Sequence, residues 1–281
     1  MNNLFFIFGF GYTAQFLAPK LTDLGYQIIG TKRAKPPNHS AYTLIDFNDP
    51  KLSDYLSKAT HLLISIPPTE AAGDLVLAHY ADLIKHHGTH IKWIGYLSST
   101  GVYGDHKGKW VDESTQCNPQ SPSGVLRLKA EHAWTVLAAQ LRIPLTIFRL
   151  AGIYGPGRNA LERIIAGKKY SIYKEGHFFS RIHVEDITSV IMASIQHPQA
   201  LSIYNVADDE PAPSHIVDAY ASQLLDQKPL ALMPFAEASL SAAEYAFYSS
   251  NRRVANTKIK NELNIVLKYP SFREGLFQCN S

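Results

Sequence analysis

A short apolar run that ends in a glycine-rich turn is the feature that most constrains the fold of this chain. The run NLFFIF at residues 3–8 leads into GFGYTA, and helical spacing begins directly after it. A strand, a GxGxxA turn and a helix in this order are typical of dinucleotide-binding α/β folds, because the glycines let a diphosphate approach the backbone. A plain turn is the alternative interpretation. The predicted cofactor-binding residues here are Gly9, Gly11, Tyr12, Thr13 and Ala14.

Apolar runs and helical segments alternate along the first half of the chain. Runs that are apolar throughout predict parallel strands covered on both faces. They lie at residues 3–8, 26–31, 60–66, 91–98 and 144–150. Helical spacing covers residues 12–24, 70–87 and 124–141, and Pro19 predicts a kink or an early stop in the first of these helices. The alternation predicts an α/β fold with a Rossmann-type doubly wound parallel sheet.

The elements become shorter after about residue 155, with a helix expected at 185–196, a strand at 202–206 and a helix at 213–226. No internal repeat is visible. We expect a dinucleotide-binding Rossmann domain at residues 1–158, with a returning segment near 182–206. A smaller C-terminal α/β substrate lobe is expected at residues 159–281.

Two basic residues at the end of the second predicted strand indicate which cofactor is bound. The segment Gly30-Thr31-Lys32-Arg33 stands where an NAD site usually carries an acidic residue, and basic residues there accommodate a 2′-phosphate. Thr31, Lys32 and Arg33 therefore favour NADP over NAD, although solvated loop charges remain the alternative. Asp46 follows the apolar segment YTLI and is expected near the adenine ring, with an ordinary loop carboxylate as the alternative.

Composition excludes several other classes of protein. Of 281 residues, 46% are hydrophobic and 18% are charged, which is typical of a globular protein. The net charge of +3 comes without a long Lys/Arg run, so we expect no nucleic-acid partner. Two distant cysteines argue against a disulfide framework and a metal site. No apolar run is long enough to span a membrane, and the first residues lack the marks of a signal peptide, so we expect a cytoplasmic protein.

Several further segments match one family. They are YLSSTGVYGD (96–105), RLAGIYGPGR (149–158), FSRIHVEDI (179–187), YNVADDEP (204–211) and YPSFREGL (269–276). With the glycine turn, they make the chain resemble the extended and atypical short-chain dehydrogenase/reductases, which include NAD-dependent epimerases and dehydratases. The resemblance implies a small-molecule substrate and a possible homodimer.

The resemblance also implies roles for individual residues. Ser99 matches the Ser/Thr that hydrogen-bonds a substrate oxygen, although a Ser-Ser-Thr cluster could also simply cap the strand. The segments at Ile66 and Pro67 and at Ala151 and Gly152 match backbone that lines the cofactor. The implied substrate-binding residues are Thr100, Tyr154, Arg158 and Arg181, whereas His183 is expected to be structural.

The segment SPSGVLRLKAE at 121–131 departs from the family pattern. In the family a Tyr-Gly-x-x-Lys motif begins this helix, and aligning Gly124 and Glu131 puts Ser123 at the tyrosine and Arg127 at the lysine. A serine hydroxyl is a poor general acid or base, and arginine does not deprotonate near neutrality, although it can hold an anion. Tyr103 and Tyr154 are candidates to supply a phenol from elsewhere, whereas Lys129 points to a different face.

Two functions follow from this mixture of kept and lost residues. The first is an NADP-dependent oxidoreductase or epimerase of a small polar or sugar-nucleotide-like substrate, with Ser99, Ser123 and Arg127 as its catalytic residues. The alternative is a catalytically eroded protein that binds NADP(H) as a sensor or regulator. A structural role without a cofactor would leave the glycine turn and the basic pair unexplained.

Overall fold

The computed structural model describes residues 3–33 and 40–280 and contains two compact units. The first unit comprises Met1–Ser99, Pro122–Arg149 and Thr188–Tyr204. The second comprises Thr100–Ser121, Leu150–Ile187 and Asn205–Ser281. The domain boundary at residue 158 remains a prediction; these units place residues 100–121 and 150–158 with the second unit.

A seven-stranded sheet with the order β11-β7-β5-β4-β1-β2-β3 forms the centre of the first unit. Strand β1 pairs in parallel with both β2 and β4, and the pairs β2·β3 and β4·β5 are also parallel. This sheet confirms the Rossmann-type α/β fold. Its strands are β1 (Leu4–Phe8), β2 (Gln27–Lys32), β3 (Thr43–Asp46), β4 (Ala59–Ile64), β5 (Trp93–Ser99), β7 (Leu145–Leu150) and β11 (Leu201–Val206).

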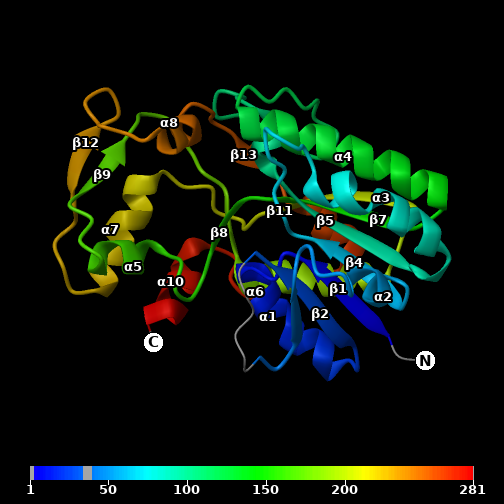
Figure 1. The fold of residues 1–281 in the computed structure, drawn as a ribbon. Helices are drawn as coiled ribbons and strands as arrows, with labels where there is room; N and C mark the ends of the chain where they lie inside the picture. Colours follow the sequence, from blue (N-terminus) through cyan, green and yellow to red (C-terminus); the bar gives the residue numbers. More distant parts are fainter. Residues whose placement is uncertain (1–2, 34–39, 281) are drawn as a thin grey trace. The chain divides into compact units, whose positions relative to one another are not determined.

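Helices cover both faces of this sheet (Figure 1). They are α1 (Tyr12–Asp23), α2 (Leu52–Leu56), α3 (Leu75–His87), η1 (Gly88–His90), α4 (Pro122–Leu141) and α6 (Val184–Gln196). Helices α3 and α4 lie on one face, and α1 and α6 lie on the other. Leu4, Phe6 and Phe8 of β1 pack on the α3 and α4 side, with Trp134 of α4 in the same buried cluster. Burial on both faces explains why the central strands are apolar throughout.

Two of the expected helices differ from the sequence-based prediction. Helix α1 continues to Asp23, so the early stop expected at Pro19 was wrong. The carbonyl that loses its donor belongs to Gln15, and both residues lie on the exposed side of the helix, where water can replace the missing bond. Helix α3 starts only at Leu75, because the Asp74 side chain caps it by accepting a hydrogen bond from the Leu77 amide at 3.0 Å.

The second unit is built from short elements. Three two-stranded parallel sheets, β8·β10, β9·β12 and β6·β13, join segments that are far apart in the sequence. A core of Tyr154, Leu161, Val217 and Phe272 packs between its helices. The elements are η2 (Thr100–Tyr103), β6 (Trp110–Val111), β8 (Gly152–Tyr154), α5 (Ala160–Ile165), β9 (Tyr170–Tyr173), β10 (Arg181–His183), α7 (Ser214–Leu224), β12 (Ala231–Pro234), α8 (Ala242–Tyr248), β13 (Arg253–Val254), α9 (Thr257–Leu263) and α10 (Phe272–Asn280).

A buried histidine lies within an aromatic cluster of the first unit. The His61 ring stacks on Phe5 at 5.6 Å with 7° between the planes, and its other ring neighbours are Tyr26 and Trp93. Burial, assisted by the charge of Lys92, lowers the pKa of His61 from 6.5 to about 4. The folded protein therefore favours the neutral imidazole.

This pKa difference predicts a loss of stability in mild acid. The unfolded chain binds the proton more tightly, so the contribution of His61 is complete above pH 6.5 and is lost as the pH falls toward about 4. A difference of this size corresponds to about 3 kcal/mol of unfolding free energy. Urea unfolding at a series of pH values measures this effect. Between pH 6.5 and about 4, the unfolding free energy of His61→Phe should decrease less than that of the wild type. The exposed substitution His86→Phe should follow the wild type. Equal pH dependence in His61→Phe and the wild type would contradict the assignment.

Candidate functional site

The glycine turn at the end of β1 has the geometry that a dinucleotide site requires. Gly9 has a φ of +90°, and a Cβ there would lie 2.8 Å from Cγ1 of Ile66. Its amide donates a hydrogen bond to Thr31 Oγ1 at 2.9 Å. A Cβ at Gly11, by contrast, would have only the Gly9 carbonyl oxygen within 4 Å, at 4.0 Å. The protein therefore requires glycine at position 9, whereas the space at position 11 is open to a ligand.

A cavity of about 560 Å³ in the first unit adjoins this turn. It brings together eight of the predicted cofactor residues, from the ends of β1, β2, β3 and β4, because parallel strands end at one edge of the sheet. These residues are Gly9, Gly11, Thr31, Lys32, Arg33, Asp46, Ile66 and Pro67. Tyr12, Thr13 and Ala14 instead form the first turn of α1, where Thr13 and Ala14 are buried.

The sequence analysis missed five other residues that line this cavity. They are Phe10, Phe47, Asn48, Ser65 and Leu75. Phe10 packs so closely on Gly30 that a Cβ at Gly30 would lie 2.6 Å from its ring. Asn48 donates its amide hydrogen bond to Asp46 Oδ1 at 2.8 Å, so this carboxylate also stabilises its own turn. Phe47 and Asn48 directly follow the strand that ends at Asp46, and this position in the sequence could have predicted that they line the cavity.

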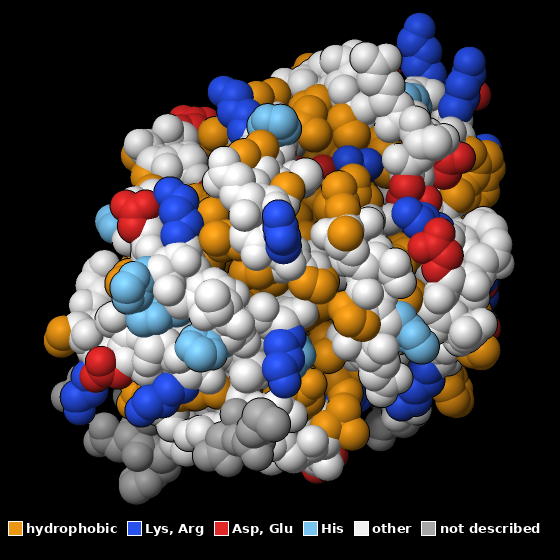
Figure 2. All heavy atoms as spheres, turned by 90° about the vertical axis from the view of Figure 1, so that its right-hand side faces the viewer, with side chains coloured by type: hydrophobic (Ala, Val, Ile, Leu, Met, Phe, Trp, Pro, Cys, Tyr) orange, Lys and Arg blue, Asp and Glu red, His pale blue; other side chains and the backbone are white. Residues whose placement is uncertain are grey.

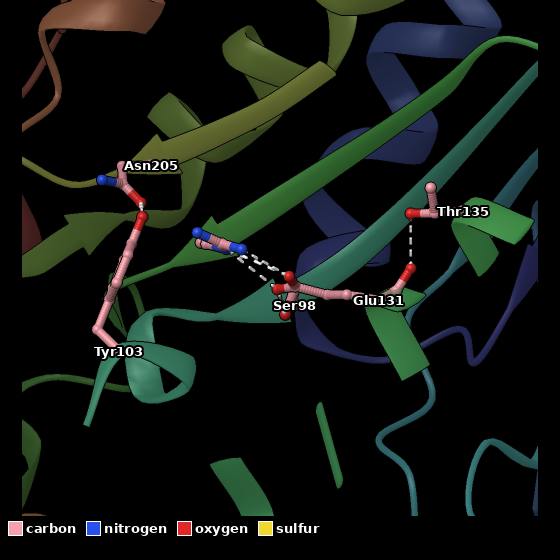
Figure 3. A network of polar contacts seen from close by, with 6 residues as sticks. Ser98, Tyr103, Glu131, Thr135 and Asn205 are labelled. Atoms are coloured by element: carbon pink, nitrogen blue, oxygen red, sulfur yellow. Dashed lines mark hydrogen bonds and ion pairs between the residues drawn. The ribbon is translucent and has the colours of Figure 1, made fainter. Parts of the chain in front are cut away.

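A buried ion pair connects three elements of the first unit (Figure 3). Glu131 of α4 accepts a hydrogen bond from Ser98 Oγ at 2.5 Å and pairs with Arg149 of β7, where Nη2 and Oε2 lie 2.8 Å apart. All three side chains are buried. Ser98 directly precedes Ser99, so the network fixes the end of β5 against α4. The sequence analysis used Glu131 only to align the helix with the family pattern. An arginine within the apolar strand TIFRL could have indicated that Arg149 needs a buried carboxylate as its partner.

Helix α4 carries Ser123 and Arg127, the residues that the sequence aligns with the tyrosine and lysine of the family pattern. Ser123 is exposed in the first helical turn, and Arg127 is half-buried one turn later. Arg127 Nη1 donates to the carbonyl oxygen of Leu97, and its guanidinium carbon lies 5.9 Å from the centre of the Tyr96 ring. Ser99 is half-buried at the end of β5 in the same unit. Arg127 is thus tied to the backbone of β5, two residues before Ser99.

Two tyrosines of the second unit donate their hydroxyl groups within that unit. Tyr103 is fully buried and donates to Asn205 Oδ1 at 2.7 Å (Figure 3). Tyr154 donates to the carbonyl oxygen of Ser271 at 3.1 Å. Burial, together with the nearby carboxylates of Asp208 and Asp186, raises the pKa of Tyr154. The environment of Tyr154 therefore does not favour proton exchange by its phenol near neutral pH.

A cavity of about 820 Å³ lies within the second unit. It brings together Tyr154, Arg158 and Arg181 of the predicted substrate residues, and Gly152 of the predicted cofactor residues. Two other predicted residues are buried and do not line it: Thr100 begins η2, and the Ala151 amide donates to the Val206 carbonyl oxygen at 3.0 Å. His183 is buried too, with its ring 3.9 Å from that of Tyr269.

Positive charge gathers in this second cavity. Arg163, Lys168 and Lys169 line it beside Arg158 and Arg181. On the face drawn in Figure 2, by contrast, Lys and Arg side chains lie singly among side chains of other kinds. The sequence shows no long Lys/Arg run, because these five cations are spread over residues 158–181 and come together only in the folded unit.

A buried carboxylate holds part of this charge in place. Asp218 of α7 is 1% exposed and lies 2.6 Å from Lys168 Nζ and 3.9 Å from Arg163 Nη2. It also accepts a hydrogen bond from Ser171 Oγ. Arg181 is fixed differently, because its Nη1 donates to the carbonyl oxygens of Phe179 and Ala212 at 3.0 and 2.8 Å. The cavity therefore presents positioned cations to an anionic ligand.

Within residues 3–33 and 40–280, no group of three or more His, Cys, Asp or Glu side chains is placed to hold a metal ion. None of the helices described there has the length and apolar character needed to cross a membrane.

Comparisons with known proteins agree with this fold and with the motifs. Protein YeeZ of Escherichia coli strain K12 is 29% identical over 278 residues, which cover 94% of this chain and 95% of YeeZ. The structure of a functionally unknown conserved protein from Silicibacter pomeroyi DSS is 42% identical with a TM-score of 0.90, covering 99% of this chain and 98% of that one.

An enzyme of named activity shares the same fold. The dTDP-glucose 4,6-dehydratase of Bacillus anthracis, solved in complex with NAD, is 18% identical with a TM-score of 0.79, covering 99% of this chain and 95% of that one. The model of the NAD dependent epimerase/dehydratase family matches residues 69–207. The resemblance found in the sequence is thereby confirmed, and the chain belongs to the NAD dependent epimerase/dehydratase family.

Proposed function

We propose that the protein is an NADP-dependent oxidoreductase or epimerase that acts on a small anionic substrate of the sugar-nucleotide type. The observation that carries this proposal is the cavity of the first unit, where the glycine turn and the basic pair Lys32 and Arg33 line one space. Membership of the NAD dependent epimerase/dehydratase family supports a nicotinamide cofactor, and the basic pair favours NADP over NAD.

The residues of this cavity fit a dinucleotide. Open space at Gly11 leaves room for a diphosphate next to the backbone, and the first turn of α1 presents amide groups to it. Gly11, as the residue that precedes the helix, provides no capping side chain. Lys32 and Arg33 would bind a 2′-phosphate, and Asp46 would lie near the adenosine. When bound, the nicotinamide supplies hydride transfer.

The cations of the second cavity support an anionic substrate. Arg158, Arg163, Lys169 and Arg181 line it together with Lys168, and a sugar nucleotide carries the negative charge that such a set binds. The dehydratase of the same fold is named for a dTDP-sugar. Ser99 would donate a hydrogen bond to a substrate oxygen, while Arg127 would stabilise negative charge near the cofactor.

A second candidate function is a sensor that binds NADP(H) without turnover. The hydrogen bonds of the candidate catalytic side chains favour it: the phenols Tyr103 and Tyr154 donate within the second unit, and the Arg127 guanidinium donates to the carbonyl oxygen of Leu97. Ser123, which the sequence aligns with the usual tyrosine, is exposed, and a serine hydroxyl is a poor general acid or base. The two candidates share the cofactor site and differ in the chemistry.

Glycine substitutions test the cofactor site. Gly11→Ala should keep the unfolding free energy within about 1 kcal/mol of the wild type, because its methyl group meets open space. It should weaken NADPH binding at least about tenfold, because the methyl group takes the place of the diphosphate. Gly9→Ala should instead lose about 1–3 kcal/mol of stability through backbone strain and the contact with Ile66. Urea unfolding measures the stability of both variants, and calorimetric titration measures their NADPH affinity. If Gly11→Ala bound NADPH as tightly as the wild type, the cofactor would bind elsewhere.

Cofactor preference depends on the basic pair. The double variant Lys32→Ala/Arg33→Ala should lose about 10- to 100-fold in NADPH affinity, the worth of one or two charge-assisted hydrogen bonds, and keep its NADH affinity. Calorimetry with both cofactors provides the measurement. Lys58→Ala removes an exposed cation elsewhere in the first unit and is the matched control. If NADPH and NADH lose affinity equally, these residues do not select the cofactor.

Turnover separates the enzyme from the sensor. If the protein is an enzyme, a screen of sugar nucleotides and small carbonyl compounds with NADPH or NADP should find hydride transfer. Ser99→Ala should then lower kcat roughly 10²-fold with unchanged NADPH affinity, because one donor to the transition state is lost. Tight NADPH binding without transfer to any compound would support the sensor, and an unchanged rate in Ser99→Ala would remove Ser99 from the chemistry.

A further inference from the structure

Two phenylalanine rings lie face to face on the wall of the second cavity. Phe179 and Phe247 both line it, with ring centres 3.9 Å apart and 4° between the planes. Aromatic pairs in proteins prefer offset or edge-to-face arrangements, because directly superposed rings repel each other through their quadrupoles. The base of a nucleotide is also a flat ring and can stack on the same face of an aromatic side chain.

The two rings are held very differently. Phe179 is 7% exposed, and its backbone exchanges hydrogen bonds with Ala212. Its ring is packed by His177 at 4.5 Å and by Tyr248 at 5.2 Å, edge to face. Phe247 is 49% exposed and lies on the seven-residue helix α8. Phe179 is therefore the fixed partner, and moving Phe247 exposes less apolar area than moving Phe179 would.

The fixed ring lies among the cations of the cavity. The guanidinium carbon of Arg181 lies 5.9 Å from the centre of the Phe179 ring. Lys168, positioned by Asp218, and Arg163 line the same cavity. Among the described lining residues, five are Lys or Arg and one, Glu244, is a carboxylate that already caps α8 through Ser241. A flat apolar face next to positive charge suits a ligand that joins a planar ring to phosphate groups.

We propose that Phe179 is the stacking platform for the base of a nucleotide ligand and that Phe247 covers this platform until the base displaces it. The inference rests on the proposed function for the class of the ligand, and it adds the residue that receives the base and the residue that competes with it. Phe247 thereby competes only with ligands that carry a ring, whereas an anion without a ring can bind to the cations and leave Phe247 in place.

Calorimetric titration with UDP, with inorganic pyrophosphate as the ligand without a ring, tests this directly. Phe247→Ala should bind UDP about three- to tenfold more tightly than the wild type, because the competing ring is gone. Phe179→Leu keeps an apolar side chain without a flat face and should bind UDP about tenfold more weakly. Pyrophosphate affinity should stay within about twofold in both variants. Tyr245→Ala removes a second exposed aromatic of α8 that does not line the cavity, and it should match the wild type.

A local fluorescence signal shows where UDP binds. In Phe247→Trp, saturating UDP should shift the emission of the added indole to longer wavelength and increase its quenching by acrylamide, after subtraction of the wild-type signal. Pyrophosphate should leave both unchanged. Circular dichroism confirms that each variant is folded, and Phe179→Tyr, which keeps the flat ring, should bind UDP like the wild type.

Each contrary result overturns the proposal. Weaker UDP binding in Phe247→Ala would mean that Phe247 holds the base, and unchanged binding would mean that it only covers the core. No UDP binding, or no change of the indole emission, would remove the base from this platform. None of these titrations needs NADPH or turnover. Failure of NADPH binding would therefore refute the proposed function alone, whereas failure of the UDP pattern in a protein that binds NADPH would refute only this inference.

Discussion

The close packing of Gly9 at the end of β1 is the constraint on which the first unit depends. Its left-handed backbone, the neighbouring Ile66 side chain and the hydrogen bond to Thr31 connect the ends of β1, β4 and β2 within a few ångströms. A side chain at this position would separate three adjacent strands. The same turn starts α1 and leaves Gly11 facing open space, so one local geometry determines both the packing and the shape of the cavity.

Buried charge plays a comparable part in both units. Glu131 and Arg149 connect α4 to β7, and Asp218 connects Lys168 and Ser171 to α7. Removing one partner from such a pair leaves an uncompensated charge in the interior, so the pairs fix the arrangement of the elements that carry them. In the first unit this arrangement positions the end of β5, and in the second it positions cations at the cavity wall.

The sequence predicted those parts of the molecule that depend on local patterns. Fully apolar runs identified β1, β2, β4, β5 and β7 because burial on both faces removes polar positions. The glycine turn and the strand ends identified Gly9, Gly11, Lys32 and Arg33 as neighbours. Parallel pairs of two to four residues, such as β6·β13, leave no periodic signal and were not foreseen. The Phe179 and Phe247 stack and the Asp218 cluster join residues about 50 or more positions apart, which a single sequence does not reveal.

The interleaved chain path of the second unit has a consequence for biosynthesis. Strand β6 at Trp110–Val111 finds its partner only in β13 at Arg253–Val254, and Tyr103 finds its acceptor in Asn205. All seven strands of the large sheet, by contrast, are present once Val206 has been translated. A nascent chain on the ribosome can therefore assemble the sheet early, while residues 100–121 wait for segments that emerge last. Chaperones that shield exposed apolar surface would be needed most in that interval.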